Sequence, residues 1–338
     1  MRATDSRAPW YSSLLAVALS LSLGLLAGCT SGSAVASPTT PTAYVATGAS
    51  VANPGNTVAV VDTVTAKAQK PITTDTLPAA LAVTPGGSDV LVANKGTDTV
   101  SEIDVASGTV VRQVTVGLEP DGVAVTPNGA LALVTNFGDN SVTPLTLPSL
   151  RAGRPIAVGR QPVSVAISPS GSLALVSNYQ DGSVTPISLP SLVAGAPVGV
   201  GPEPVDVFIA SGGTTALVAN FQTSAVTPIS LPGLVPAPPI DIAGNPTGIA
   251  GLSPTIVYVS GGDSVIPVDL LTRQPGPGID VGTTAEGLAL APGGSTAWVC
   301  GGDGTLVHVD LVAHSVIGRV AVGSQPSAVV IAAGGSSG

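Results

Sequence analysis

The sequence of 338 residues is poor in the side chains that enzymes and nucleic-acid-binding proteins rely on. Charged residues make up 9% of the chain and aromatic residues 3%, and there are two cysteines and two histidines. Lysine occurs at only three positions, and the formal net charge is -9. Because a phosphate backbone attracts clustered Lys and Arg, we expect no nucleic-acid partner.

The shortage of charge also argues against a helical protein, because helix surfaces usually carry Glu, Lys and Arg. The sequence has instead 42 glycines, 31 prolines and 44% apolar residues. Valine and threonine favour strands, whereas glycine and proline favour turns. The composition therefore predicts many short strands around a substantial core.

Two histidines and two cysteines leave little material for catalysis by side chains. A Ser-His-Asp or Cys-His arrangement needs an imidazole, and neither His308 nor His314 lies in a motif. The sequence also lacks the clustered His, Cys and carboxylate spacing typical of zinc sites. Cys300, in the segment TAWVCGG, is expected to fill a strand core as a small apolar residue. We therefore expect a binding module rather than an enzyme.

The first 28 residues predict export. Two arginines precede an apolar stretch, 14–26, that is too short to span a bilayer comfortably. The ending LAGC resembles a bacterial lipobox, at which a signal peptide is removed just before a lipidated cysteine. The resemblance implies a signal peptide at 1–28 and a diacylglycerol on Cys29, which would anchor the protein to the outer side of the bacterial cytoplasmic membrane. An ordinary secretory signal and an uncleaved anchor are the alternatives.

The segment after the signal predicts a tether. Residues 29–41 are rich in Ser, Thr, Pro and Gly and have little to bury, which is typical of a flexible linker. We expect one folded domain at 42–335 and a short tail at 336–338.

Nearly the same eighteen residues occur three times, as LVTNFGDNSVTPLTLPSL, LVSNYQDGSVTPISLPSL and LVANFQTSAVTPISLPGL, each copy 42 residues after the last. A residue ahead of each unit marks the wider period: Pro78, Pro120, Pro162, Pro204, Pro246, Ala285 and Pro326. A period in the low forties is the length of one four-stranded propeller blade. Each unit supplies four strand-like runs, such as DGVAVTP, ALALVTN, SVTPLTL and RPIAVG.

The two ends of the repeat region predict how the ring closes. Six complete units run from Pro78 to Gln325, and the segments TAYVA, NTVAVVD and QKPITT ahead of them match the second, third and fourth runs. The last segment, PSAVVIAAGG, matches the first run alone. One C-terminal strand and three N-terminal strands would therefore build a seventh blade and leave no free sheet edge. The predicted fold is an all-β, seven-bladed β-propeller of four-stranded antiparallel blades.

The third run of four units contains a proline, at Pro144, Pro186, Pro228 and Pro267. Because proline has no N–H to donate, this repetition predicts a bulge or an unpaired position in the third strand. His308 occupies the same position of its unit and is interpreted as a structural substitution.

The runs LVTN, LVSN, LVAN and YVAT, with TPNG-like turns before them and VGxxP after them, resemble the YVTN-type repeat of seven-bladed β-propellers over residues 42–335. That family includes bacterial and archaeal surface proteins and is similar in fold to lactonase-type and quinoprotein-type propellers. The resemblance implies the fold and leaves the activity open. The motif asparagine gives way to glycine at Gly261 and Gly301, so we expect no seven-fold symmetric use of it.

In a propeller, the loops entering the innermost strands share one face with the loops between second and third strands, and function usually lies there. The predicted ligand-binding mouth contains acids, aromatic residues and motif asparagines: Glu119, Asp121, Asn136, Phe137, Asn178, Tyr179, Glu203, Asp206, Asn220, Phe221 and Glu286. The alternative interpretation is that the acids are solvated turn residues and that the aromatic rings fill gaps between blades.

The sequence thus predicts a lipid-anchored cell-envelope propeller that binds a protein, peptide or glycan on one face. A lactonase-type hydrolase, with a divalent cation, and a redox partner with a quinone are the alternatives from other classes. We expect no cofactor, although Ca²⁺ could bind between Glu119 and Glu203 if their carboxylates converge.

Overall fold

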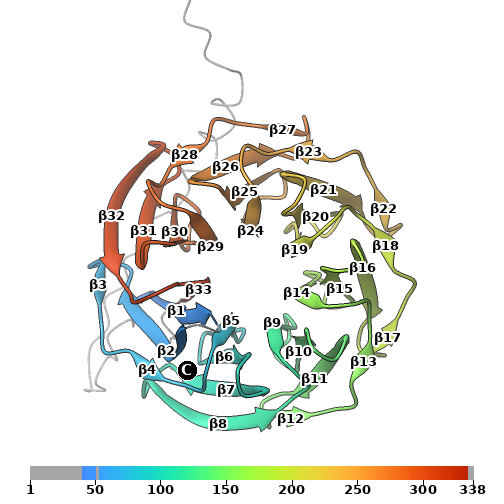
Figure 1. Cartoon of the computed structure of the whole chain (residues 1–338), viewed down its shortest axis with the longest axis horizontal. Helices are drawn as coiled ribbons and strands as arrows, with labels where there is room; N and C mark the ends of the chain where they lie inside the picture. The colour runs from blue at the N-terminus through green and yellow to red at the C-terminus, as the bar shows by residue number, and fades with distance from the viewer. Residues whose placement is uncertain (1–39, 51–52, 334–338) are drawn as a thin grey trace, which may run out of the picture. The chain divides into compact units, whose positions relative to one another are not determined.

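The computed structural model describes residues 40–50 and 53–333, which belong to one compact unit. Seven antiparallel sheets surround a common axis (Figure 1). In each blade the strands follow one another in chain order from the channel outward, apart from the spliced blade. The described residues contain no helix long and apolar enough to cross a membrane. The predicted all-β, seven-bladed propeller is confirmed.

The channel is lined by the innermost strands and enclosed by the second strands. The innermost strands are β5 (Pro78–Val83), β9 (Pro120–Val125), β14 (Pro162–Ile167), β19 (Pro204–Ile209), β24 (Pro246–Ala250), β29 (Ala285–Leu290) and β33 (Ala328–Ala332). The second strands are β6 (Asp89–Asn94), β10 (Leu131–Asn136), β15 (Leu173–Asn178), β20 (Thr215–Asn220), β25 (Ile256–Gly261), β30 (Thr296–Gly301) and β1 (Thr42–Ser50).

The third and fourth strands complete the blades toward the outside of the ring. The third strands are β7 (Thr99–Asp104), β11 (Ser141–Thr146), β16 (Ser183–Ser188), β21 (Ala225–Ser230), β26 (Ser264–Asp269), β31 (Thr305–Asp310) and β2 (Asn53–Asp62). The fourth strands are β8 (Thr109–Thr115) and β32 (Ser315–Ala321), and the two-part strands β12 (Arg151–Ala152) with β13 (Ile156–Ala157), β17 (Val193–Ala194) with β18 (Val198–Gly199), β22 (Val235–Pro236) with β23 (Ile240–Asp241), β27 (Gln274–Pro275) with β28 (Ile279–Asp280), and β3 (Lys67–Ala68) with β4 (Ile72–Thr73).

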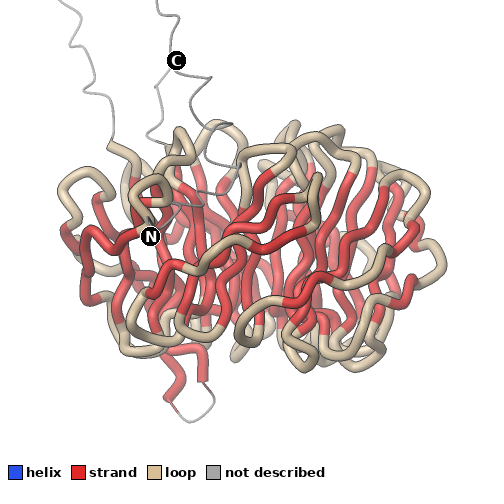
Figure 2. Tube along the Cα trace, turned by 90° about the horizontal axis from the view of Figure 1, so that it is seen from above, coloured by secondary structure: helices blue, strands red, loops and turns tan. Residues whose placement is uncertain are grey.

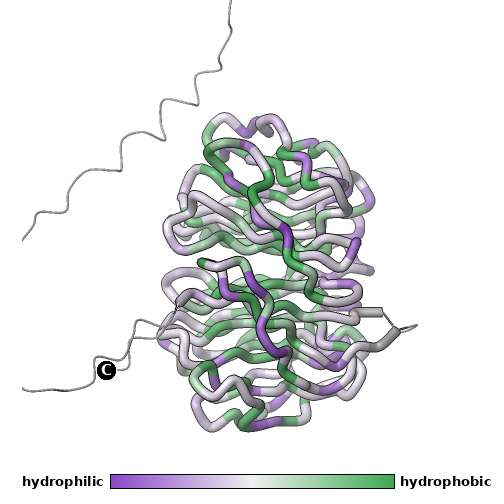
Figure 3. Tube along the Cα trace, turned by 90° about the vertical axis from the view of Figure 1, so that its left-hand side faces the viewer, coloured by the Kyte–Doolittle hydropathy of each residue, from purple (hydrophilic) through white to green (hydrophobic). Residues whose placement is uncertain are grey.

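The core lies between neighbouring blades, which explains why the second strands are apolar along nearly their whole length. Leu91 of β6 packs in one cluster with Val134 of β10, and Val45 of β1 packs in another with Trp298 of β30. Hydrophobic stretches run along the strands inside the ring wall (Figure 3). A strand covered on both faces buries both of its alternating sets of side chains.

The repeated proline of the third strand coincides with the break in the fourth strand. Leu145 pairs with Ala152 and Val142 pairs with Ile156, whereas Pro144 faces the interruption and accepts a hydrogen bond of 2.8 Å from the Gly153 N–H. In the blade of His308 the outer strand β32 runs without interruption. The blade of β2 has Val60 at this position and its fourth strand is also broken, into β3 and β4. The third-strand proline thus faces an unpaired stretch in its four blades, while the break itself follows prolines of the fourth strand such as Pro71 and Pro155.

The ring closes through the predicted splice. In the sheet β3-β2-β1-β33, Val45 of β1 pairs with Val329 of β33, so the C-terminal strand supplies the innermost position of a blade whose other strands are N-terminal. With this arrangement, the innermost strand of every blade lies between the innermost strands of two adjacent blades. The joint between the two ends of the chain then leaves β1 with no free edge.

The ring has two different faces. The terminus face carries the start of β1 and the end of β33, together with the connections from first to second and from third to fourth strands. The mouth face carries the connections from second to third strands and from each fourth strand to the next first strand. The hairpin of β1 and β2 is longer than the others and projects beyond the ring at the mouth face (Figure 2).

Candidate functional site

Two sets of loops meet at the mouth face. The Phe137 N–H donates to the carbonyl of Glu119 at 3.0 Å, and the Phe221 N–H donates to the carbonyl of Glu203 at 3.0 Å. Each predicted aromatic residue thus lies beside the residue that precedes an innermost strand. Glu119 and Glu203 have φ of 51° and 52°, a left-handed conformation that costs a non-glycine residue free energy and is held here by the paired loops.

The motif asparagines hold these loops together from inside the blades. Asn136 is fully buried, and its Nδ2 donates to Ser141 Oγ and Thr143 Oγ1, each at 2.9 Å. Its Oδ1 accepts from the Gly117 N–H at 3.2 Å. One side chain therefore ties the second strand, the third strand and the loop that enters the innermost strand.

Asn178 and Asn220 repeat the donation from Nδ2 to the third strand, but their buried Oδ1 atoms accept no hydrogen bond. The Asn178 Nδ2 donates to Thr185 Oγ1 at 2.9 Å, and the Asn220 Nδ2 donates to Thr227 Oγ1 at 2.8 Å. A Cβ on Gly159 would lie 2.5 Å from the Asn178 side chain, so the preceding loop requires glycine at that point. These three predicted residues shape the mouth from within, and their burial keeps them from a ligand on the surface.

At the channel mouth, Asp121 pairs with a lysine that the sequence analysis did not select. The Lys95 Nζ lies 2.8 Å from Asp121 Oδ2 and 4.4 Å from the centroid of the Phe137 ring. Burial raises the pKa of Asp121, and the charge of Lys95 opposes this increase. A cavity of about 110 Å³ opens beside the pair and is lined by Leu77, Ala79, Lys95, Asp121 and Ser327.

Asp206 lies in the channel and connects three innermost strands. Its Oδ1 accepts from Ser164 Oγ of β14 at 2.7 Å and from the Val207 N–H at 2.9 Å, and its Oδ2 accepts from the Ile249 N–H of β24 at 2.8 Å. Burial raises the pKa of Asp206 to about 6, although the three hydrogen bonds favour the ionised form. Both carboxylate oxygens are therefore engaged within the protein.

Glu286 of β29 is the third predicted acid on an innermost strand, and burial raises its pKa. Cys300 is buried in β30, and burial raises the pKa of its thiol, which is the behaviour of a core residue rather than of a reactive thiolate. His308 stacks on Trp298 with ring centroids 4.0 Å apart, and burial lowers the pKa of its imidazole. The stacking gives this histidine a packing role in its blade.

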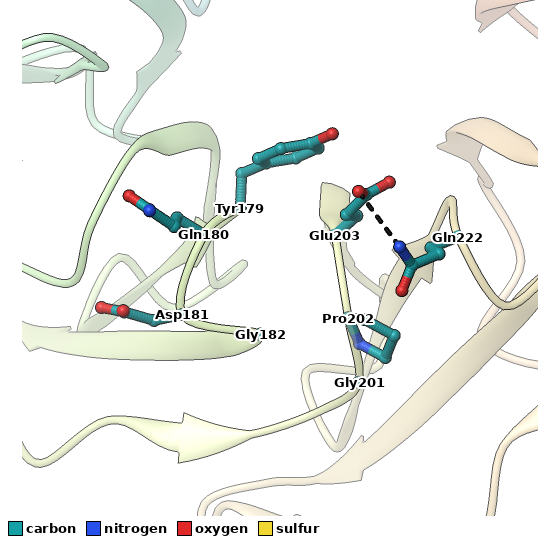
Figure 4. A pocket seen from close by; sticks show the side chains of 8 residues that line it. All are labelled: Tyr179, Gln180, Asp181, Gly182, Gly201, Pro202, Glu203 and Gln222. Atoms are coloured by element: carbon teal, nitrogen blue, oxygen red, sulfur yellow. Dashed lines mark hydrogen bonds between the residues drawn. The ribbon is translucent and has the colours of Figure 1, made fainter.

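An open groove of about 530 Å³ lies between two neighbouring blades (Figure 4). Its walls include the loop that joins β15 to β16 and the loop that joins β20 to β21. Glu203 stands opposite Tyr179, and the Gln222 Nε2 donates to Glu203 Oε1 at 3.4 Å. Burial raises the pKa of Tyr179, and the charge and hydrogen bonding of Glu203 raise it further. The lining residues are Tyr179, Gln180, Asp181, Gly182, Gly201, Pro202, Glu203 and Gln222.

Arg160 forms an ion pair with Asp181, which lines this groove. Its Nε lies 2.6 Å from Asp181 Oδ1, and its backbone N–H donates to Asp181 Oδ2 at 2.7 Å. These bonds to Arg160 hold the pKa of Asp181 below its usual value. One side of the groove therefore carries the Tyr179 phenol and the paired carboxylate of Asp181, and the opposite side carries the Glu203 carboxylate and the Gln222 amide.

Charge is divided unequally between the two faces. The acids toward the mouth face are Asp75, Asp98, Glu119, Asp121, Asp139, Asp181, Glu203, Asp206, Asp241, Asp263, Asp280, Glu286 and Asp303. The bases on that side are Lys95, Arg160 and Arg319. Toward the terminus face the acids Asp62, Asp89, Glu102, Asp104, Asp269 and Asp310 are matched by Lys67, Lys70, Arg112, Arg151, Arg154 and Arg273. The negative excess of the folded domain thus belongs to the mouth face.

The structure brings together some predicted residues and separates others. Lys95 contacts both the Phe137 ring and the Asp121 carboxylate, and Tyr179 faces Glu203. Asp206 is hydrogen-bonded to Ser164 and to none of the other predicted acids. Phe221 is 38% exposed on the rim. Across the described residues, no three His, Cys, Asp or Glu side chains gather as metal ligands would. Cys29 lies outside the described residues.

No protein-family model and no curated protein matches this chain. Among solved structures, hydrazine synthase from Kuenenia stuttgartiensis is similar with a TM-score of 0.69 at 18% identity, over 74% of this chain and 88% of that one. A functionally unknown protein from Desulfotomaculum acetoxidans DSM 771 has a TM-score of 0.76 at 17% identity, over 86% and 98% of the two chains. The dihydro-heme d1 dehydrogenase NirN, in complex with DHE, has a TM-score of 0.63 at 16% identity, over 87% and 76%. These similarities show the propeller fold.

Proposed function

We propose that this protein is a non-enzymatic, lipid-anchored module of the bacterial cell envelope that binds a cationic partner on its mouth face. The partner is a peptide or protein segment rich in Lys and Arg. The observation that carries the proposal is the collection of the domain's negative excess on one face of the ring. A surface of one sign raises the association rate of partners of the opposite sign and suppresses others.

The groove offers a binding site for a cationic side chain on this negatively charged face. Glu203 and Tyr179 face each other across a volume of about 530 Å³, which is large enough for an extended side chain. An ammonium or guanidinium group there would find a carboxylate, an amide oxygen and an aromatic ring within one site. Phe221 adds an exposed ring on the neighbouring loop.

Calorimetric titration with a ten-residue oligolysine tests the proposal. We expect binding at low ionic strength that weakens steadily as salt is added, and no binding of the same peptide with acetylated side chains. The double variant Glu119→Gln with Glu203→Gln should bind at least several-fold more weakly. The matched control Asp89→Asn with Asp104→Asn removes the same charge from the terminus face and should bind as the wild type does.

Equal weakening by both double variants would show that net charge alone attracts the peptide, and would reject the mouth as its site.

Two further experiments test the lipid anchor and the calcium site. Metabolic labelling with a fatty-acid analogue should mark the wild type and not Cys29→Ser. A calcium site between Glu119 and Glu203 would appear as a calcium-dependent rise in melting temperature that the Gln double variant lacks.

A further inference from the structure

Six of the ten large apolar side chains that are exposed among the described residues lie on the terminus face. Val64, Val193, Val235, Leu271 and Val312 lie where a third strand turns into a fourth, and Leu252 lies in the connection between β24 and β25. Their exposed fractions run from 56% to 77%. An exposed apolar set of this kind on one face marks an interaction surface. We call these six residues the apolar rim.

An aspartate at the end of the third strand fixes the turn around three of the rim residues. The Asp269 Oδ1 accepts from the Leu271 N–H at 2.8 Å and from the Thr272 N–H at 3.0 Å, and the Asp310 Oδ1 makes the corresponding bonds in its own turn. The aspartate at the end of the strand fixes the turn that carries Val64, Leu271 or Val312 two residues later. Val193 and Val235 are instead the first residues of β17 and β22.

The rim forms one continuous arc. Its residues come from five consecutive blades, those containing β14, β19, β24, β29 and β1. In the two remaining blades the corresponding turns carry Ala106 and Arg151. The apolar side chains therefore extend over most of the terminus face and are missing only at the blades of β5 and β9.

The described chain enters the ring beside this arc. The Thr63 N–H donates to the carbonyl of Pro41 at 3.1 Å, so the segment leading to β1 runs directly next to the turn of Val64. Extended backbone from Cys29 to Thr42 reaches at most about 45 Å. A lipid on Cys29 would therefore keep the terminus face within reach of the bilayer that holds it.

We infer that the apolar rim lies against the membrane surface and that the mouth face points away from it. Charge favours the same orientation, because acids and bases balance on the terminus face whereas an anionic headgroup layer repels the mouth face. Val and Leu side chains on the turns enter the interfacial region, and the tether raises their effective concentration there. The inference rests on the proposed lipid anchor only for bringing the face to the bilayer.

Fluorescence quenching in vesicles tests this orientation with the full-length protein extracted from membranes. A bimane label is placed on Val235→Cys at the rim or on Leu118→Cys, which is exposed at the mouth, and Cys300 is buried and stays unlabelled. The vesicles contain phosphatidylethanolamine, phosphatidylglycerol and a lipid with a nitroxide on its headgroup. We expect the label at 235 to be quenched at least twofold more than the label at 118.

A second pair of variants separates lipid contact from simple tethering. With the label on Val64→Cys, the triple change Val193→Ser, Val235→Ser and Leu271→Ser should remove at least half of the quenching. The control Val111→Ser with Ile317→Ser alters apolar residues that are about half exposed on outer strands, away from the rim, and should leave it unchanged.

Protein that floats with the vesicles but is quenched equally at 235 and 118 would overturn the orientation and leave the lipid anchor standing. Protein that does not float at all would overturn both. Failure of oligolysine binding, with quenching still confined to the rim, would reject the proposed mouth function alone.

Discussion

The carboxylate of Asp206 accepts a hydrogen bond of 2.7 Å from the hydroxyl of Ser164, 42 residues earlier and at the same position of the preceding blade. The same carboxylate accepts from the Ile249 N–H of the following blade at 2.8 Å. One carboxylate therefore binds three successive units to one another, through the equivalent residue of the preceding unit and a backbone N–H of the following one. The contact makes Asp206 a structural element of the channel rather than a free acid at its mouth.

Replacing Asp206 should reveal its titration in the stability of the protein. Its pKa in the folded protein is about 6, above the ordinary value of 3.8, so its contribution to stability is complete below about pH 4 and is lost as pH rises through 6. The free energy of unfolding of the wild type, minus that of Asp206→Asn, should fall by about 2 kcal/mol between pH 4 and pH 7. Urea unfolding at several pH values measures this difference, and a constant difference would contradict the assignment.

The pair of Lys95 and Asp121 should behave as a coupled unit. Lys95→Met leaves a largely desolvated carboxylate without its cation and should cost about 2 to 3 kcal/mol of stability at pH 7. The double variant with Asp121→Asn should recover a large part of this loss. Simple additivity of the two single changes in a double-mutant cycle would show that the pair is not coupled.

The exposed pair of Arg160 and Asp181 is the matched comparison. The Arg160 side chain is 61% exposed, whereas that of Lys95 is 30% exposed. Solvent screens the exposed pair, so Arg160→Met should cost less than about 1 kcal/mol.

Asn136 should matter for stability and not through contact with a ligand. Asn136→Ala leaves the buried hydroxyls of Ser141 and Thr143 and the Gly117 N–H without their partner, which should cost about 2 to 4 kcal/mol. Gln180→Ala, on the exposed lining of the groove, should change stability by less than about 0.5 kcal/mol. Thermal unfolding of the two variants compares them, and equal effects would reject the role assigned to the motif asparagine.

Closure of the ring should depend on β33. Deleting residues 326–338 removes the innermost strand that pairs with β1 and exposes an unpaired edge, so the melting temperature should fall by at least about 10 °C. Deleting only 334–338 leaves β33 whole and should change it little. A small shift for the longer deletion would mean that the two ends do not share a blade in solution.

The period of the sequence was sufficient to predict the fold, because the anchor residue, a proline in six of the seven units, recurs at or just before the start of each innermost strand. The prediction that Asn136 contacts a ligand was wrong. It rested on the repetition of this asparagine beside a loop, but the side chain is buried and forms hydrogen bonds within the blade. A residue needed by each blade recurs for packing as readily as for binding.

The partners within the mouth were not predictable, because they join different blades. Lys95 comes from the blade before that of Asp121, and Ser164 comes from the blade before that of Asp206. Such contacts depend on how the blades are rotated about the channel, and no spacing within one unit reports that rotation. The unequal charge of the two faces likewise appears only when each loop has been assigned to a face.

The most direct test of the account asks which carboxylates a cationic partner touches. Oligolysine is bound to the protein at low ionic strength, joined to it with a zero-length carbodiimide cross-linker, and the modified acids are identified by mass spectrometry. We expect cross-links at solvent-accessible acids of the mouth face, Glu119 and Glu203 above all. Cross-links found equally at Asp89, Asp104 and Asp269 of the terminus face would contradict it.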